Sequence, residues 1–215
     1  MTRRRSSRSG FTLYEVVITA GLLGVVFAAT GMVSRSTSDL ASFSGEKSRT
    51  ETRARRAIDR VVEELAMAGR GMLAPDPAAP GWTGDLDFQC VSGTAGGLPV
   101  WGPLTTLRWE REPNELADGQ DNDGDGLVDE GRVVLVRDSG GPNPQTVVLC
   151  SGVAEFAEGE TAAIGDENGN GLEDESGFSL QRDGELMTVR LTLQEQVQPG
   201  QMITTSVRTS FRLRN

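Results

Sequence analysis

The sequence predicts an α+β fold in which one long N-terminal helix packs on an antiparallel β-sheet head. Three observations support this prediction. A mostly apolar run occupies residues 11–33, helical spacing of apolar residues continues over 34–71, and period-two alternation appears beyond residue 84. We therefore expect a single globular head of residues 72–215 on a helical stalk.

The apolar run is the first element of the predicted stalk. Its 23 residues would span about 35 Å as a helix, which is enough to cross a bilayer core of about 30 Å. The segment before it, residues 1–10, holds four arginines and no acid, so the arginines should stay in the cytoplasm and the head should lie outside. Glu15 departs from an ordinary anchor, because a carboxylate inside a membrane is costly and needs a partner.

The residues around this acid resemble a known processing signal. Residues 10–15, GFTLYE, resemble the G-F-T-L-x-E prepilin motif of type IV pilins and type II secretion pseudopilins. The resemblance implies that prepilin peptidase cuts 1–10 away as a leader, between Gly10 and Phe11, and methylates the new amino terminus. It also implies that Glu15 pairs with the terminal amine of a neighbouring subunit, where two buried charges would neutralise each other. The alternatives are a plain signal anchor and a conventional signal peptide cut near Ala29, and neither explains Glu15.

The second half of the helix, residues 34–71, is more polar but keeps one apolar face. Because that face recurs at steps of three and four, we expect it to pack on the head; its residues include Ala54, Ile58, Val61, Leu65 and Ala68. Acidic residues alternate with the arginines of this segment, so we interpret the arginines as part of a solvent-exposed face rather than a DNA-binding one. The helix end, D-x-x-x-x-E-L-x-x-A-G over residues 59–69, resembles that of PilW-type minor pilins.

The rest of the chain is predicted to be rich in strands. Residues that alternate between apolar and polar predict an antiparallel sheet on the second half of the helix, which is the pilin-like arrangement that the resemblance implies. The predicted strands are 85–91, 104–110, 132–137, 145–150, 152–156, 178–182, 185–194 and 202–213. Cys90 and Cys150 are the only cysteines, and both lie in predicted strands of a domain outside the membrane, so we expect a disulfide rather than two free thiols.

Composition narrows the function. The formal charge is -10, which disfavours general nucleic-acid binding, and the chain has no histidine and a single lysine. Without histidine, a Ser-His-Asp triad and an H-E-x-x-H zinc site are excluded, and no phosphate-binding P-loop surrounds Lys47. We therefore expect a protein that is not an enzyme.

Much of the negative charge lies in two loops, 118–130 and 166–175, that repeat one pattern 45 positions apart. Both resemble the D-x-[DN]-x-[DN]-G loops of EF-hands and thrombospondin-type repeats, which implies calcium, although both lack the acid six residues after the glycine. The first site would use Asp121, Asp123, Asp125, the Leu127 carbonyl, and Asp129 or Glu130. The second would use Asp166, Asn168, Asn170, the Leu172 carbonyl, and Asp174 or Glu175. With more acids, the first should bind tighter; the alternative is a pair of solvated turns.

Together these features predict a minor pilin that primes or tips a type IV pilus. The resemblance implies a precursor in the inner membrane with its head in the periplasm, followed by incorporation into a filament at the cell surface. The implied partners are prepilin peptidase, other pilins, the inner-membrane assembly platform and a tip adhesin. A J-type pseudopilin of type II secretion and a membrane-anchored calcium-binding adhesin are the alternatives.

Overall fold

The computed structural model describes residues 12–161, 166–169, 175–198 and 200–213. Its contacts divide the chain into two units, one ending at Gly45 and the other running from Glu46 to Asn215. Helix α1, Leu13–Leu65, begins in the first unit and ends in the second. The last turns of this helix are therefore part of the head.

In the first unit, α1 exposes its apolar side chains. Every side chain described between Thr12 and Ser38 is exposed, and an 18-residue window of the helix has a mean hydropathy of 2.3. Within the described residues, α1 alone is long and apolar enough to cross a membrane. The structure thus has one candidate membrane anchor near its N-terminus.

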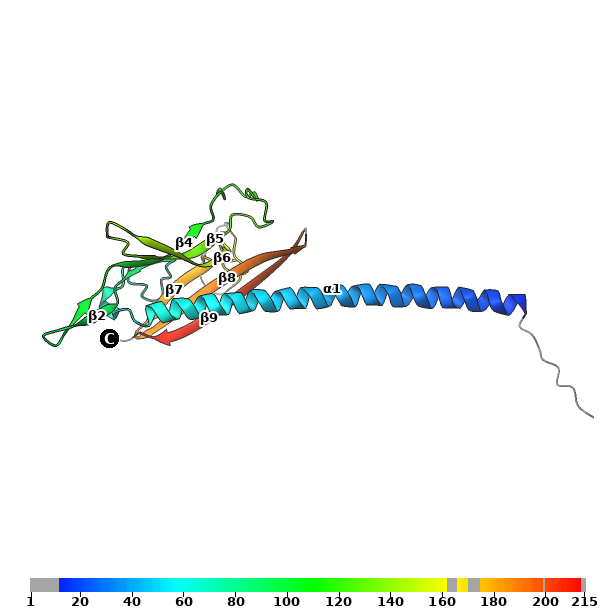
Figure 1. The fold of residues 1–215 in the computed structure, drawn as a ribbon, viewed down its shortest axis with the longest axis horizontal. Helices are drawn as coiled ribbons and strands as arrows, with labels where there is room; N and C mark the ends of the chain where they lie inside the picture. The colour runs from blue at the N-terminus through cyan, green and yellow to red at the C-terminus, as the bar shows by residue number, and fades with distance from the viewer. Residues whose placement is uncertain (1–11, 162–165, 170–174, 199, 214–215) are drawn as a thin grey trace, which may run out of the picture. The chain divides into compact units, whose positions relative to one another are not determined.

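The head is built on an antiparallel sheet of seven strands (Figure 1). Strand neighbours follow the order β1-β4-β5-β6-β8-β7, and β9 also pairs with β8. The strands are β1 Asp85–Phe88, β4 Thr105–Arg111, β5 Gly131–Arg137, β6 Gln145–Val153, β7 Phe178–Asp183, β8 Leu186–Gln198 and β9 Gln201–Arg212. β6 continues from the predicted strand 145–150 into the start of the predicted strand 152–156, because the chain bulges there instead of turning, and it ends at Val153.

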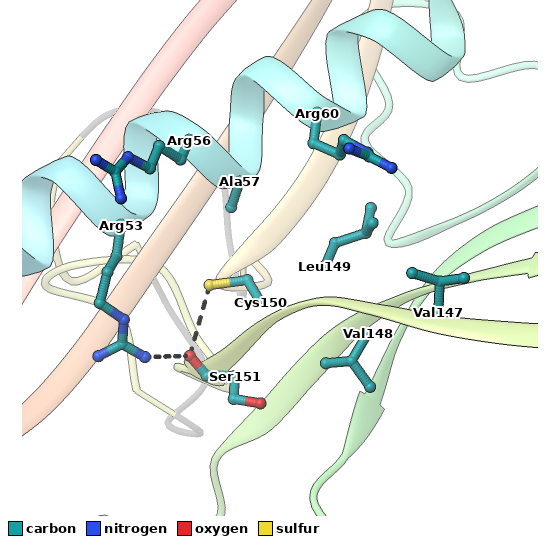
Figure 2. A pocket seen from close by; sticks show the side chains of 9 residues that line it. All are labelled: Arg53, Arg56, Ala57, Arg60, Val147, Val148, Leu149, Cys150 and Ser151. Atoms are coloured by element: carbon teal, nitrogen blue, oxygen red, sulfur yellow. Dashed lines mark hydrogen bonds between the residues drawn. The ribbon is translucent and has the colours of Figure 1, made fainter.

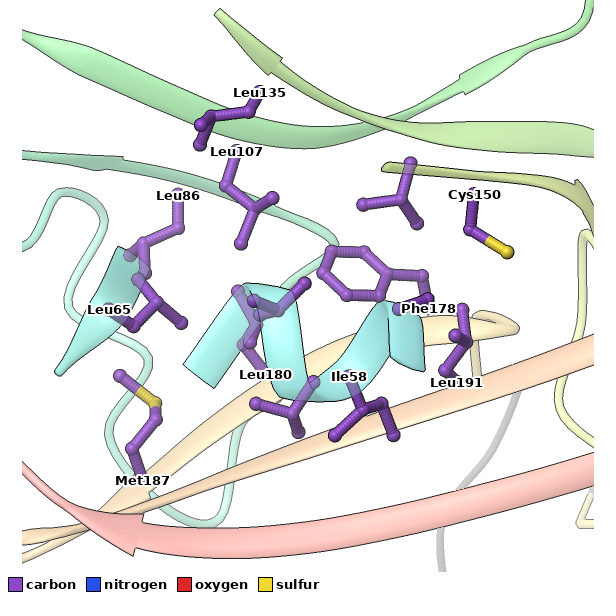
Figure 3. Close-up of a cluster of buried hydrophobic side chains, with 14 of the residues drawn as sticks. Ile58, Leu65, Leu86, Leu107, Leu135, Cys150, Phe178, Leu180, Met187 and Leu191 are labelled. Atoms are coloured by element: carbon purple, nitrogen blue, oxygen red, sulfur yellow. The ribbon is translucent and has the colours of Figure 1, made fainter. Parts of the chain in front are cut away.

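The core lies where one face of α1 packs against the sheet. Four side chains of that face, Ala54, Ile58, Val61 and Leu65, are at most 2% exposed. They contact a single cluster that includes Phe178 and other residues from β1, β4, β5, β7 and β8 (Figure 3). The predicted arrangement of a long helix on an antiparallel sheet is confirmed.

Two elements differ from the prediction. Helix α1 ends at Leu65, and a short 3-10 turn, η1 Arg70–Met72, follows it. A small hairpin of β2, Val91–Ala95, and β3, Leu98–Trp101, lies outside the main sheet. Its turn residues Gly96 and Gly97 have φ of 60° and 81°, which suits a tight hairpin turn. The hairpin has almost no buried residues, so it lacks the alternation by which the other strands were predicted.

Candidate metal centre

The register of two strands closes the first acidic loop. Arg111 at the end of β4 pairs with Gly131 at the start of β5, so the intervening residues form one long insertion. At its base, the backbone N–H of Glu112 donates to the carbonyl of Glu130 over 3.3 Å. The sheet therefore holds two glutamates opposite each other where the loop begins and ends.

The aspartates of the loop fold its backbone into a tight turn. Asp121 accepts hydrogen bonds from the N–H groups of Gly124 and Gly126, at 2.6 and 2.9 Å. Both glycines have positive φ, 84° and 91°, which residues with a Cβ rarely adopt. Asp125 accepts from the Leu127 N–H at 2.9 Å. Within this turn, the carboxylates of Asp121 and Asp123 lie close to each other.

Five carboxylates converge at this turn. Among the described residues, two groups have carboxylate oxygens within 4.8 Å of one another, and Asp123 belongs to both. One group is Glu112, Asp123 and Glu130, and the other is Glu115, Asp121 and Asp123. Carboxylates this close repel one another unless a cation or protons intervene. The arrangement offers only oxygen ligands, which suits a hard cation such as calcium.

Buried oxygens within these groups are without partners in the described part of the chain. Glu130 is fully buried, and neither of its carboxylate oxygens accepts a hydrogen bond. Glu115 is 6% exposed; its Oε1 accepts from the N–H groups of Asn122 and Asp123, while Oε2 has no partner. Burial, together with nearby Asp125, Glu115 and Asp123, raises the pKa of Glu130 to about 7. A cation bound between Glu112, Asp123 and Glu130 would give the buried Glu130 carboxylate a partner.

The structure changes the set of candidate ligands in this loop. It places predicted Asp121, Asp123 and Glu130 in the carboxylate groups but not Asp129. Asp129 instead accepts from the N–H groups of Asp118 and Gly119 and lies 3.3 Å from Arg111. Asp125 is not in either group, although it acts electrostatically on Glu130. The role of the Leu127 carbonyl stays a prediction.

Sequence reasoning missed two acids, Glu112 and Glu115. Glu112 follows a predicted strand and carries no motif signal of its own. Glu115 could have been found, because Glu160 stands 45 positions later and so belongs to the same repeat as the aspartates. Both residues precede the D-x-D-x-D motif in the chain. The pairing of β4 with β5 closes the loop and brings them close to that motif.

The second acidic loop is partly described. Ala157 N–H donates to the Glu175 carbonyl at 2.7 Å, and Glu160 Oε1 accepts from the Asn168 N–H at 3.4 Å. Asp166 and Asn168 lie within the described residues, whereas the predicted ligands Asn170, Leu172 and Asp174 lie outside them. Glu175 is buried and forms an ion pair with Arg190. Its neighbourhood thus already holds a positive charge.

The processing residues Gly10 and Phe11 also lie outside the described residues, while Glu15 lies inside them. Glu15 Oε2 accepts from the backbone N–H of Thr12 at 2.9 Å and from its hydroxyl at 3.0 Å. Thr12 Oγ1 accepts in return from the Glu15 N–H at 3.3 Å, which makes a capping box at the start of α1. Glu15 therefore has a local role that the sequence prediction did not include.

The predicted disulfide between Cys90 and Cys150 is wrong: both thiols are free. Phe88, Thr105, Arg137 and Gln145 are matched in register across four strands. Because β6 bulges, Cys150 pairs with Val133, four residues or about 13 Å from that level, and it lies three strands, or about 14 Å, from β1. A disulfide requires Cα atoms within about 7 Å, so strand register separates the pair.

Cys150 lies instead in a groove between α1 and β6, of about 640 Å³ (Figure 2). Arg53 and the Cys150 thiol both donate to the Ser151 carbonyl, at 3.4 and 3.5 Å. Burial raises the pKa of Cys150 to about 11, so its thiol stays protonated at neutral pH. Arg53 is paired with Glu195 at 3.1 Å, which ties α1 to β8. The groove thus lies between α1 and β6, and its thiol is in the neutral form.

Comparison with known protein families, with curated proteins and with solved structures finds no match to this chain.

Proposed function

We propose that this chain is a minor pilin of a type IV pilus, made as an inner-membrane precursor and incorporated into a filament after leader cleavage. The observation that carries the proposal is α1 itself. Its first half exposes apolar side chains, while its last turns pack one face against the antiparallel sheet and form part of the hydrophobic core. One helix would thereby serve as a stem, in the membrane or in a filament, and as the element on which the sheet of the head packs.

Glu15 supports this proposal over a plain anchor. It is the one acid between Phe11 and Val33, and an anchor that only had to stay in lipid would do better without it. In a filament, the amine of a cleaved neighbour would neutralise the carboxylate. Cleavage after Gly10 by prepilin peptidase would create that amine. The assembly platform and other pilins would then be the partners of the stem.

We further propose that the loop from Glu112 to Glu130 binds calcium and stabilises the head. Glu112, Glu115, Asp121, Asp123 and Glu130 would hold the ion, because their oxygens already converge and the buried Glu130 carboxylate has no hydrogen-bond partner in the described part of the chain. Calcium takes six to eight oxygen ligands, so main-chain oxygens and water would complete the shell. An ion bound to the folded state alone at a hundredfold excess over Kd adds about 2.7 kcal/mol of stability.

The filament proposal is tested by shearing filaments from cells that express the chain. The protein should appear in the sheared fraction of cells with an intact prepilin peptidase. It should stay in the inner membrane when that peptidase is deleted. Recovery in neither fraction, with release of a soluble head, would refute the filament role.

A further inference from the structure

The two acidic loops share a hydrogen-bonded framework as well as a sequence pattern. In the first, Glu112 N–H donates to the Glu130 carbonyl and Glu115 N–H to the Glu112 carbonyl, at 3.3 and 3.2 Å. In the second, Ala157 N–H donates to the Glu175 carbonyl and Glu160 N–H to the Ala157 carbonyl, at 2.7 and 3.0 Å. Each residue of the second set lies 45 positions after its counterpart.

The inner glutamates also match. Glu115 and Glu160 are both buried, and each accepts a backbone N–H of its loop through Oε1, from Asp123 at 2.9 Å and from Asn168 at 3.4 Å. In each case Oε2 is buried and has no partner among the described residues. The second loop is therefore a copy of the first in its backbone closure and in this inward-facing acid.

The loops differ in how their last glutamate is neutralised. Glu130 is fully buried and forms no ion pair with any described residue, whereas Glu175 is buried in an ion pair with Arg190. The second loop also carries fewer acids, since Ala157 stands for Glu112 and Asn168 for Asp123. At the five positions where the first loop has converging carboxylates, the second loop has three acids, and the last of these, Glu175, is paired with a basic side chain.

Arg190 is fixed in place by its surroundings. It lies on β8, and its side chain is only 15% exposed. The guanidinium lies over the Trp82 ring, 4.6 Å from the centroid, which is a favourable cation–π distance. Arg190 and Asn168 line the same cavity, of about 260 Å³, so the guanidinium faces the loop. A divalent ion entering there would be repelled by the positive charge of this guanidinium.

We propose that Arg190 supplies to the second loop the positive charge that calcium supplies to the first, so that the head binds one calcium ion per chain. This inference rests on the proposed calcium function of the first loop. It replaces the expectation of two unequal sites with one metal site and one site neutralised by an arginine.

The test is calorimetric titration of calcium into the full mature chain in detergent micelles, with melting temperatures measured in EDTA and in millimolar calcium. Wild type should bind one ion. Arg190→Met removes the charge while keeping much of the side-chain volume, so it should bind two. In EDTA this variant should melt below wild type, because the buried Glu175 loses its ion pair, and calcium should restore most of the loss.

Arg208→Met is the matched control, because Arg208 also lies over Trp82, at 5.8 Å, but is not in the ion pair with Glu175. It should still bind one ion and show the wild-type response to calcium. Asn168→Asp, which adds an acid but keeps Arg190, should also stay at one ion. If Arg190→Met does not fold, Asn168→Asp still tests whether Arg190 prevents a second ion from binding.

Three results would overturn the assignment to Arg190. They are two ions in wild type, a second ion in Asn168→Asp, or an Arg190→Met variant that folds and still binds one ion. Absence of calcium heat in every variant would instead refute the calcium function of the first loop. The two failures are thus distinguishable.

Discussion

Removing the charge of Glu130 should stabilise the head when calcium is absent and abolish its response when calcium is present. In the calcium-free protein, a fully buried carboxylate has no partner among the described residues, and burial raises its pKa from 4.5 to about 7. A folded-state pKa above the unfolded value contributes stability that is present below pH 4.5 and lost as the pH rises through about 7. Calcium-free wild type should therefore weaken between pH 5 and pH 8.

The magnitude follows from the pKa. At about 1.4 kcal/mol per pKa unit, a rise from 4.5 to about 7 corresponds to about 3 kcal/mol at pH 8. Much of the surrounding loop is exposed, and water there screens the charge, so we expect about 2 kcal/mol. Glu130→Gln keeps the shape and removes the charge, so in EDTA at pH 8 it should gain about this much free energy of unfolding.

Denaturant unfolding of the head, followed by tryptophan fluorescence in EDTA at pH 5 and pH 8, measures this effect. Glu63→Gln is the control, because the same substitution at an exposed residue should change stability by no more than about 0.5 kcal/mol. In millimolar calcium, wild type should recover its stability at pH 8 while Glu130→Gln should not respond. If Glu130→Gln is less stable than wild type in EDTA at pH 8, the buried charge of Glu130 does not lower the free energy of unfolding, and the reasoning is refuted.

Three other predictions concern packing, the thiols and the stem. Leu65→Ala should lower the free energy of unfolding by about 2 to 5 kcal/mol, whereas Met67→Ala, at a side chain that is 59% exposed, should have little effect in the same denaturant titration. Cys90 and Cys150 should both react with a thiol reagent in denaturant without reduction; a reaction only after reduction would contradict the separation set by the sheet register. Glu15→Gln, which can keep the capping bonds, and Glu15→Val should both be cleaved after Gly10. Both should be depleted from sheared filaments. If Glu15→Gln is recovered in filaments as well as wild type is, the role of Glu15 is limited to helix capping.

The regular part of the head was predictable because burial leaves a period in the sequence. The strands predicted at 104–110, 132–137 and 178–182 differ from β4, β5 and β7 by at most one residue at each end. The first residues of β4 alternate between buried and partly exposed, whereas β5 is buried at four successive residues and is visible in the sequence as a short run of apolar residues. The exposed β2–β3 hairpin buries almost nothing and left no such pattern.

The candidate metal centre was predictable only in its local part. Asp121 and Asp123 stand in a short motif whose spacing reflects the turn that they cap. Glu112 lies near these aspartates because β4 pairs with β5. Asp129 is paired with Arg111, which leaves Glu130 as the candidate ligand. The disulfide prediction failed for the same reason, since pairing of Cys90 with Cys150 depends on register and not on strand membership. Long-range partners of this kind have no signal in a single sequence.

The most direct test of the filament-subunit account is the intact mass of the protein purified from cells with and without prepilin peptidase. The account predicts a chain that begins at Phe11 and carries one added methyl group when the peptidase is present, and an uncut precursor when it is absent. A chain that begins near Met32, or one that keeps Met1 in both strains, would contradict it.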